Sequence, residues 1–248
     1  MHTGDTRLNQ IVTLWSEIRA AHNDADAQRQ QARERLLDRY SGAIYRYLLG
    51  ALGDAEAAHD LHQEFAVRFL SGRLQGVDRE QGRFREFVKG VLYNLIAEHH
   101  QRKARRERQI VDEVPDRAAP CAIAQEREEV FRHSWRQELL SRSWAALKAH
   151  EQSSEQPFYR VLFWRAQHPE QSSQEMAEAL SEQLGRPISA ANLRKMLERA
   201  RAAFGDLLVE EVIHSLAVAN RDTVAEELAE IGLLEMMREA LERRFAGS

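Results

Sequence analysis

The amino-acid sequence predicts an all-α protein of two helical domains, joined by a linker and followed by a C-terminal helical extension. Glycine (12) and proline (5) are scarce among the 248 residues, whereas residues that favour helices are plentiful. Apolar residues recur three and four positions apart along most of the chain, which is the spacing of a buried helical face. The clearest interruption is the segment 110–125, IVDEVPDRAAPCAIAQ, which has two prolines, three acidic residues and no helical periodicity.

These observations divide the chain into four parts. We expect a first domain over residues 1–109, a linker over 110–125, a second domain over 126–214 and an extension over 215–248. Apolar residues make up 43% of the chain and charged residues 30%, so a packed core is expected and global disorder is not.

The composition also limits where the protein works. One cysteine, Cys121, excludes an intramolecular disulfide and a cysteine-rich zinc site. No apolar run approaches the roughly 18 residues of a membrane span, and the start MHTGDTRLNQ lacks the features of a signal peptide. We therefore expect a cytoplasmic protein with no membrane partner.

The first domain is predicted to contain four helices. The first three cover 7–21, 29–49 and 55–70, and Asp54 has the side chain to cap the third. Gly72 and Gly76 mark the connection to the fourth. The expected buried stripe of this fourth helix consists of Phe84, Phe87, Val88, Val91, Leu92, Leu95 and Ile96.

The second domain is predicted to end in a helix-turn-helix. Helices over 126–149 and 157–168 precede it. Ser172 and Glu175 then have the spacing of a capping box, Gly185 is placed to end that helix, and Ser189 can cap the next. Two helices joined by a tight glycine-containing turn are typical of this DNA-binding motif.

The extension is predicted to form one last amphipathic helix. It covers 223–245 and begins with a capping box between Thr223 and Glu226. Its apolar side is expected to pack on the helix-turn-helix, with binding of a regulator as the alternative.

Charge is distributed unevenly along the chain. The net charge is −4, but residues 83–108 contain eight Lys or Arg and three Glu, a local excess of +5. Tyr93, Asn94 and His100 fall off the apolar stripe of the same helix. Cations follow phosphates, a ring stacks on a base and an amide bonds a base edge, so the segment suits single-stranded DNA. The alternative is a solvated helix end whose cations favour the helix dipole.

Two further groups are candidates for binding. On the second helix of the helix-turn-helix, Asn192 can read adenine, Arg194 and Arg199 can read guanine and Lys195 can meet phosphate. Helical hairpins without a DNA role look similar.

His59 and His62 share a helix face, so a metal site is conceivable. The neighbouring Asp60, Gln63 and Glu64 would equally suit docking on a basic protein. No enzyme constellation is present, and we expect neither an enzyme nor a cofactor or resident metal.

Three segments in this order resemble the extracytoplasmic-function group of the sigma-70 family. LLDRYSGAIYRYLLGALGDAEAAHDLHQEFAVRFL (36–70) and GRFREFVKGVLYNLIAEHHQRKARR (82–106) resemble the two halves of the family's promoter-melting domain. SSQEMAEALSEQLGRPISAANLRKMLERARAAFGDLL (172–208) resembles its C-terminal helix-turn-helix, and the pattern QEF…GRFREFVKGVL resembles sigma factors abundant in planctomycete-type bacteria.

The resemblance implies a transcription initiation factor that binds core RNA polymerase and promoter DNA, both duplex and melted single strand. A regulator such as an anti-sigma factor is a further partner. Core polymerase would be bound by Asp60, Gln63 and Glu64. The −35 element would be bound by Ser189, Asn192, Arg194, Lys195 and Arg199. The −10 element would be bound by Lys89, Tyr93, Asn94, His100, Arg102, Lys103, Arg105 and Arg106.

The chain also departs from the family pattern. His59 and His62 stand where members often have acidic residues or threonine, and the connection LSEQLGRPIS is longer than the usual turn. Two alternatives remain open: a stand-alone helix-turn-helix regulator and a helical adaptor without DNA binding.

Overall fold

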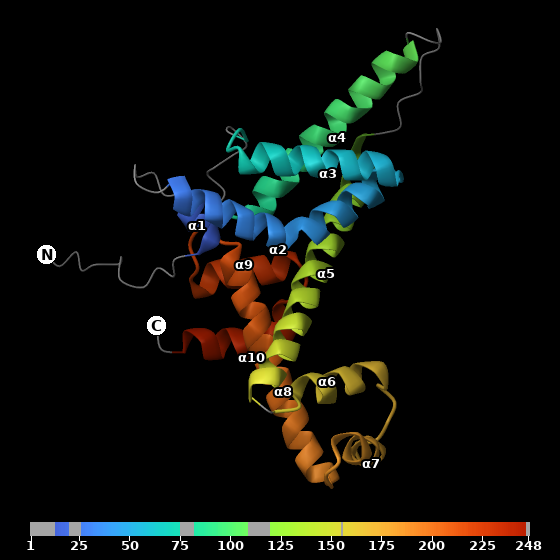
Figure 1. Cartoon of the computed structure of the whole chain (residues 1–248), viewed down its shortest axis with the longest axis vertical. Helices are drawn as coiled ribbons and strands as arrows, with labels where there is room; N and C mark the ends of the chain where they lie inside the picture. The colour runs from blue at the N-terminus through green and yellow to red at the C-terminus, as the bar shows by residue number, and fades with distance from the viewer. Residues whose placement is uncertain (1–12, 20–25, 75–81, 109–119, 155, 247–248) are drawn as a thin grey trace, which may run out of the picture. The chain divides into compact units, whose positions relative to one another are not determined.

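The computed structural model describes residues 13–19, 26–74, 82–108, 120–154 and 156–246, and all regular structure in these ranges is helical (Figure 1). This confirms the all-α prediction. None of the described helices is long and apolar enough to cross a membrane. The helices are α1 (Leu14–Arg19), α2 (Asp26–Leu52), α3 (Ala55–Leu70), α4 (Phe84–Arg108), α5 (Pro120–Ser154), α6 (Phe158–Gln167), α7 (Ser173–Leu184), α8 (Ala190–His214), α9 (Arg221–Glu230) and α10 (Leu234–Phe245).

The chain forms two compact units. The first unit consists of Met1–Glu138 with Ile213–Ile231, and the second unit consists of Leu139–Val212 with Gly232–Ser248. The long helices α5 and α8 therefore each contribute residues to both units. The units do not coincide with the predicted domains, because part of the expected extension belongs to the first unit. The assignment of sigma-factor roles to the domains stays a prediction.

An aromatic cluster forms the core of the first unit. The ring of Trp15 lies 5.1 Å from that of Phe84, and Tyr40 stacks on Trp135 at 4.5 Å. All seven apolar residues expected to be buried in α4 are buried. The predicted stripe is confirmed, because a helix with one continuous apolar face is stabilised by burying it.

The start of α3 also follows the prediction. Asp54 has an extended backbone, and its side chain accepts hydrogen bonds from the backbone N–H groups of Glu56 and Ala57. Such a cap satisfies donors that the first helical turn leaves without partners.

The predicted linker is wrong over residues 120–125, which belong to α5; residues 110–119 lie outside the described part of the chain. Pro120 is the first residue of α5. Proline is favoured at a first helical position, where its missing N–H has no partner to lose and its φ already suits a helix. The second proline of the segment therefore begins a helix and does not extend the linker.

The C-terminal extension contains two helices, α9 and α10, in place of the single one expected. Gly232 separates them with a φ of +72°, a left-handed conformation that glycine adopts readily. The capping prediction is also wrong: Asn220 caps α9, and Thr223 is the partner residue in its capping box. Asn220 has an extended backbone and lies three residues before the Thr223 hydroxyl, which is the spacing of a capping box. Asn220 is therefore the cap, and Thr223 lies inside the helix.

Residues before and within α9 complete the first unit beside the start of α4. The backbone N–H of Phe84 donates to the carbonyl of Ser215 at 2.8 Å, and that of Ala217 donates to the carbonyl of Gly82 at 2.7 Å. A short antiparallel bridge thus joins two segments that lie far apart in the sequence.

Five charged side chains extend this junction, and we call them the Arg–Glu cluster: Arg83, Arg85, Glu226, Glu227 and Glu230. Arg85 Nε lies 2.7 Å from Glu227 Oε1, and Arg83 Nη2 lies 2.6 Å from Glu226 Oε2. Both arginines also contact Glu230. Burial opposes the charge on Arg85, but attraction to Glu227 outweighs it, so the pKa of Arg85 is raised.

In the second unit, α7 and α8 are two helices joined by the short turn 185–189. Buried Met176, Ala177 and Leu180 of α7 pack with Leu193 and Leu197 of α8. The capping box of Ser172 with Glu175 and the left-handed Gly185 are both confirmed.

Helix α10 packs on α8 within the same unit. A Cβ added at Gly205 would lie 3.0 Å from the Cβ of Ala240, and Arg243 Nη2 lies 2.8 Å from Asp206 Oδ1. The expected packing of the extension on the helix-turn-helix is therefore correct for α10. It does not hold for α9, which belongs to the first unit.

Replacing Gly185 with alanine is expected to destabilise the protein by about 1 kcal/mol, because an L side chain is strained at a φ of +65°. No atom lies within 4 Å of the added Cβ, so backbone strain alone acts. Chemical denaturation measures the effect. Gly185→Asn is the control and should retain more stability, because Asn tolerates this conformation. An equal loss in both variants would contradict the explanation.

Candidate nucleic-acid interface

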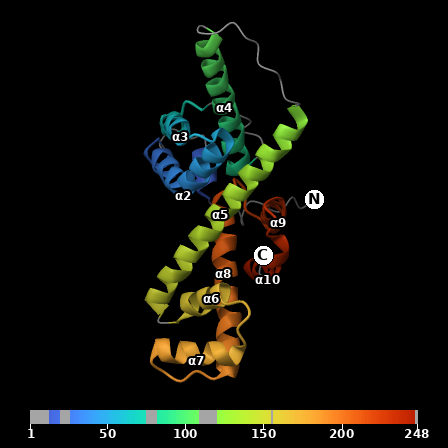
Figure 2. The same cartoon turned by 90° about the vertical axis from the view of Figure 1, so that its right-hand side faces the viewer.

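The C-terminal part of α4 carries the most exposed cations of the predicted −10 site. It extends beyond α3 in both views (Figures 1 and 2). Arg102, Lys103, Arg105 and Arg106 are all exposed. Of these, only Arg102 has an ion pair with the described residues, at 3.2 Å between its Nη2 and Glu64 Oε2. Three neighbouring cations thus remain available to an anionic ligand.

Lys89 and Tyr93 do not belong to that exposed surface. Lys89 Nζ lies 2.7 Å from Glu86 Oε2 and 3.1 Å from Glu128 Oε1, and the Tyr93 hydroxyl donates to Glu128 Oε2 at 3.1 Å. Burial and the Glu128 carboxylate raise the pKa of Tyr93 to about 12. The expectation of a free Tyr93 ring is wrong, because the first part of α5 contacts this side of α4.

Asn94 and His100 lie on the surface of α4, as expected. Partial burial, neighbouring His99 and the cations Arg127 and Lys103 lower the pKa of His100. This shift favours the neutral ring, whose nitrogens can form hydrogen bonds without adding positive charge.

The predicted −35 residues are exposed around the N-terminus of α8. Ser189, Asn192, Arg194, Lys195 and Arg199 all reach solvent. Ser189 Oγ also accepts a hydrogen bond from the backbone N–H of Asn192 at 3.2 Å, so this hydroxyl caps the helix as expected.

A hollow of about 440 Å³ lies on one side of this helix start. Its charged and amide side chains are Arg186, Asn192, Lys195 and Arg199. Arg194 is not part of its lining, whereas Arg186 of the turn is. Sequence reasoning missed Arg186, although its position directly after the turn glycine was a usable signal.

The three predicted docking residues on α3 differ in their surroundings. Asp60 is exposed and has no ion pair with the described residues. Gln63 Nε2 donates to His59 Nε2 at 2.8 Å. Glu64 contacts Arg68 and Arg102, so a ligand must compete for its carboxylate.

His59 and His62 each have a different hydrogen-bond partner, Gln63 and Ser41. His62 Nε2 is hydrogen-bonded to Ser41 Oγ at 2.8 Å, and burial together with His59 lowers the pKa of His62. Within the described ranges, no group of three or more His, Cys, Asp or Glu side chains is arranged to hold a metal ion.

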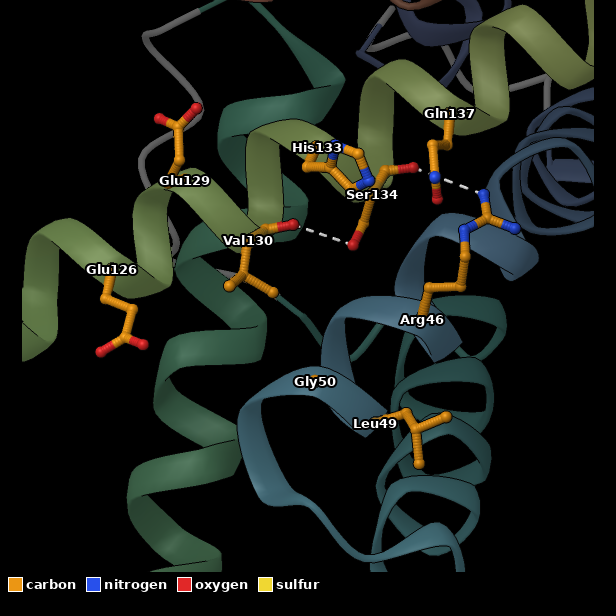
Figure 3. Close-up of a pocket in the computed structure, with 9 residues that line it drawn as sticks. All are labelled: Arg46, Leu49, Gly50, Glu126, Glu129, Val130, His133, Ser134 and Gln137. Atoms are coloured by element: carbon orange, nitrogen blue, oxygen red, sulfur yellow. Dashed lines mark hydrogen bonds between the residues drawn. The ribbon is translucent and has the colours of Figure 1, made fainter.

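A second hollow, of about 580 Å³, lies between α2 and the first part of α5 (Figure 3). Leu49, Gly50 and Val130 give it an apolar floor, and Glu126 and Glu129 lie on the α5 side. Arg46 reaches across and donates to the carbonyl of Ser134 at 3.3 Å. Sequence reasoning missed this feature, because its two walls are distant in the chain.

Comparisons with protein-family models, curated proteins and solved structures found no match for this chain. The resemblance to sigma factors therefore stays a prediction.

Proposed function

We propose that the protein is an RNA polymerase sigma factor of the extracytoplasmic-function type, which acts in the cytoplasm and directs promoter recognition and melting. The observation that carries this proposal is the exposed group Lys103, Arg105 and Arg106 at the end of α4, in a chain with a net charge of −4. Cations that have no ion pair with the described residues attract phosphates through a local field that does not depend on net charge.

Each unit has a separate role in this proposal. In the first unit, the cations of α4 hold the backbone of the melted −10 strand, while Asn94 and His100 contact bases. In the second unit, the start of α8 enters the major groove at the −35 element. Melting needs no covalent step, because capture of unstacked bases offsets the few kcal/mol of unpairing.

Core polymerase is proposed to bind the outer side of α3. Asp60 offers a carboxylate there, and Val67 is 64% exposed two turns further along the helix. An exposed apolar side chain next to acidic and amide groups suits a protein partner with a basic rim.

The test is binding of the purified chain to bacterial core RNA polymerase, with Asp60→Lys beside the wild type. We expect submicromolar binding that the variant weakens at least about tenfold, because a like charge opposite a basic partner is repelled. Glu126→Lys is the matched control: it makes the same charge change at an exposed position of the first unit, on α5. No binding by the folded wild-type chain would overturn the proposal.

The packing of α7 on α8 keeps one alternative open, a stand-alone helix-turn-helix regulator. Such a protein binds its duplex tightly without polymerase, whereas a sigma factor needs polymerase for promoter-specific binding. This alternative function gives the exposed cations of α4 no role. Comparing duplex affinity with and without core polymerase separates the two.

A further inference from the structure

The two sides of the α8 start differ in charge. Lys195 follows Asn192 by three positions and Arg199 follows it by seven. These three side chains therefore share one side of the helix. At about 100° per residue, Arg194 points roughly 160° away from Asn192. Arg194 instead shares its side with Arg201, seven residues later.

Charged residues of both signs lie near that second side, around Arg201. Arg201 lines a different hollow, of about 430 Å³, together with Glu198, Glu235 and Glu239. The three carboxylates are only partly balanced by Arg201 and Arg243, so this hollow attracts phosphate groups less than a lining of cations alone would. The side that carries Asn192 combines three cations with one amide and is the better match for DNA.

The turn before α8 holds Arg186 on the same side. The backbone N–H of Arg186 donates to the carbonyl of Ser181 at 3.2 Å, and Ser181 Oγ accepts from the N–H of Ile188 at 2.8 Å. These hydrogen bonds fix the backbone of the turn, so the turn loses little conformational entropy when a ligand binds. The positive end of the α8 dipole adds to the attraction for phosphate at this point.

We infer that Arg186, Asn192, Lys195 and Arg199 form the DNA-contacting face of the helix-turn-helix and that Arg194 lies outside it. Arg186 and Lys195 contact phosphates, while Asn192 and Arg199 read base edges in the major groove. The inference rests on the proposed function for its ligand, DNA. It adds Arg186 to the predicted −35 residues and removes Arg194 from them.

The experiment uses the full chain with core RNA polymerase and a random duplex library, from which bound sequences are selected and read. Arg186→Ala should reduce the slope of log affinity against log salt by about 1, as one lost phosphate contact does. Asn192→Ala and Arg199→Ala should relax the selected sequence at particular base pairs and weaken the preferred site about five- to hundredfold.

Arg194→Ala is the matched control, because it removes the same charge as Arg186→Ala and Arg199→Ala from an exposed position of α8. It should change neither the salt slope nor the selected sequence. Circular dichroism of each variant verifies the helical fold.

Two outcomes would overturn the inference. In the first, the wild type binds duplex DNA, and Arg194→Ala weakens that binding as much as Arg186→Ala does. The assignment of the DNA-contacting face is then wrong, while the proposed function stands. If the wild type binds no duplex with or without polymerase, the proposed function fails and the inference fails with it. Selection of an altered sequence by Asn192→Ala but not by Arg194→Ala supports the inference.

Discussion

Replacing Arg85 with methionine is expected to destabilise the protein by about 3–5 kcal/mol, because it leaves a buried carboxylate without its main partner. Arg85 is 2% exposed and Glu227 is fully buried. Once Arg85 is removed, the nearest remaining cation of the cluster is Arg83, at 3.8 Å from Glu227 Oε2. Chemical denaturation of the full chain measures the loss in the free energy of unfolding.

The double variant Arg85→Met with Glu227→Leu should recover most of the lost stability. Apolar side chains of similar size replace a buried ion pair at little cost, and often with gain. The double-mutant cycle therefore separates the penalty of an uncompensated charge from the worth of the pair itself.

The control is an ion pair of similar length on the surface. Arg238 Nη2 lies 2.6 Å from Glu235 Oε1, but the two side chains are 63% and 82% exposed. Arg238→Met should change stability by less than about 0.5 kcal/mol, because exposed pairs are weak. A loss at Arg85 as small as that at Arg238 would show that Glu227 finds water or another partner.

Neutralising Arg105 and Arg106 together is expected to weaken DNA binding by the polymerase complex on every promoter. Both side chains are exposed at the end of α4 and lack ion pairs with the described residues. Each lost phosphate contact reduces the salt slope by about 0.9 on duplex and about 0.7 on a single strand. The double Gln variant should therefore lose about 1.8 on duplex or about 1.4 on melted DNA.

Arg102→Gln is the comparison for this prediction. Arg102 is already paired with Glu64, so it contributes less to binding and its loss should reduce the slope less. Measuring affinity at several salt concentrations, on a duplex and on a pre-melted promoter, distinguishes the two contact types. Unchanged slopes in the double variant would favour the helical adaptor without DNA binding.

The elements that follow local rules could be predicted from the sequence. The buried stripe of α4, the Asp54 cap, the Ser172 capping box and the left-handed Gly185 each depend on residues within one or two helical turns. The break at Gly232 also had a local signal, a glycine between two amphipathic helices, but the continuous apolar spacing obscured it.

The candidate sites were predictable only in part, for a related reason. Exposure of Asn94, Arg105 and Arg106 follows from their position on a single amphipathic helix. Tyr93 and Lys89 meet Glu128, and Glu64 meets Arg102, so whether those groups are free depends on the neighbouring helix.

The sequence by itself determined most of the helices, most of their caps and the concentration of cations at the end of α4. Only the tertiary structure decided which of those side chains have partners. It also brought Arg85 to Glu227 across 142 residues of chain. Helix formation and capping depend on bonds between near neighbours, whereas burial and ion pairing depend on which distant segments pack together.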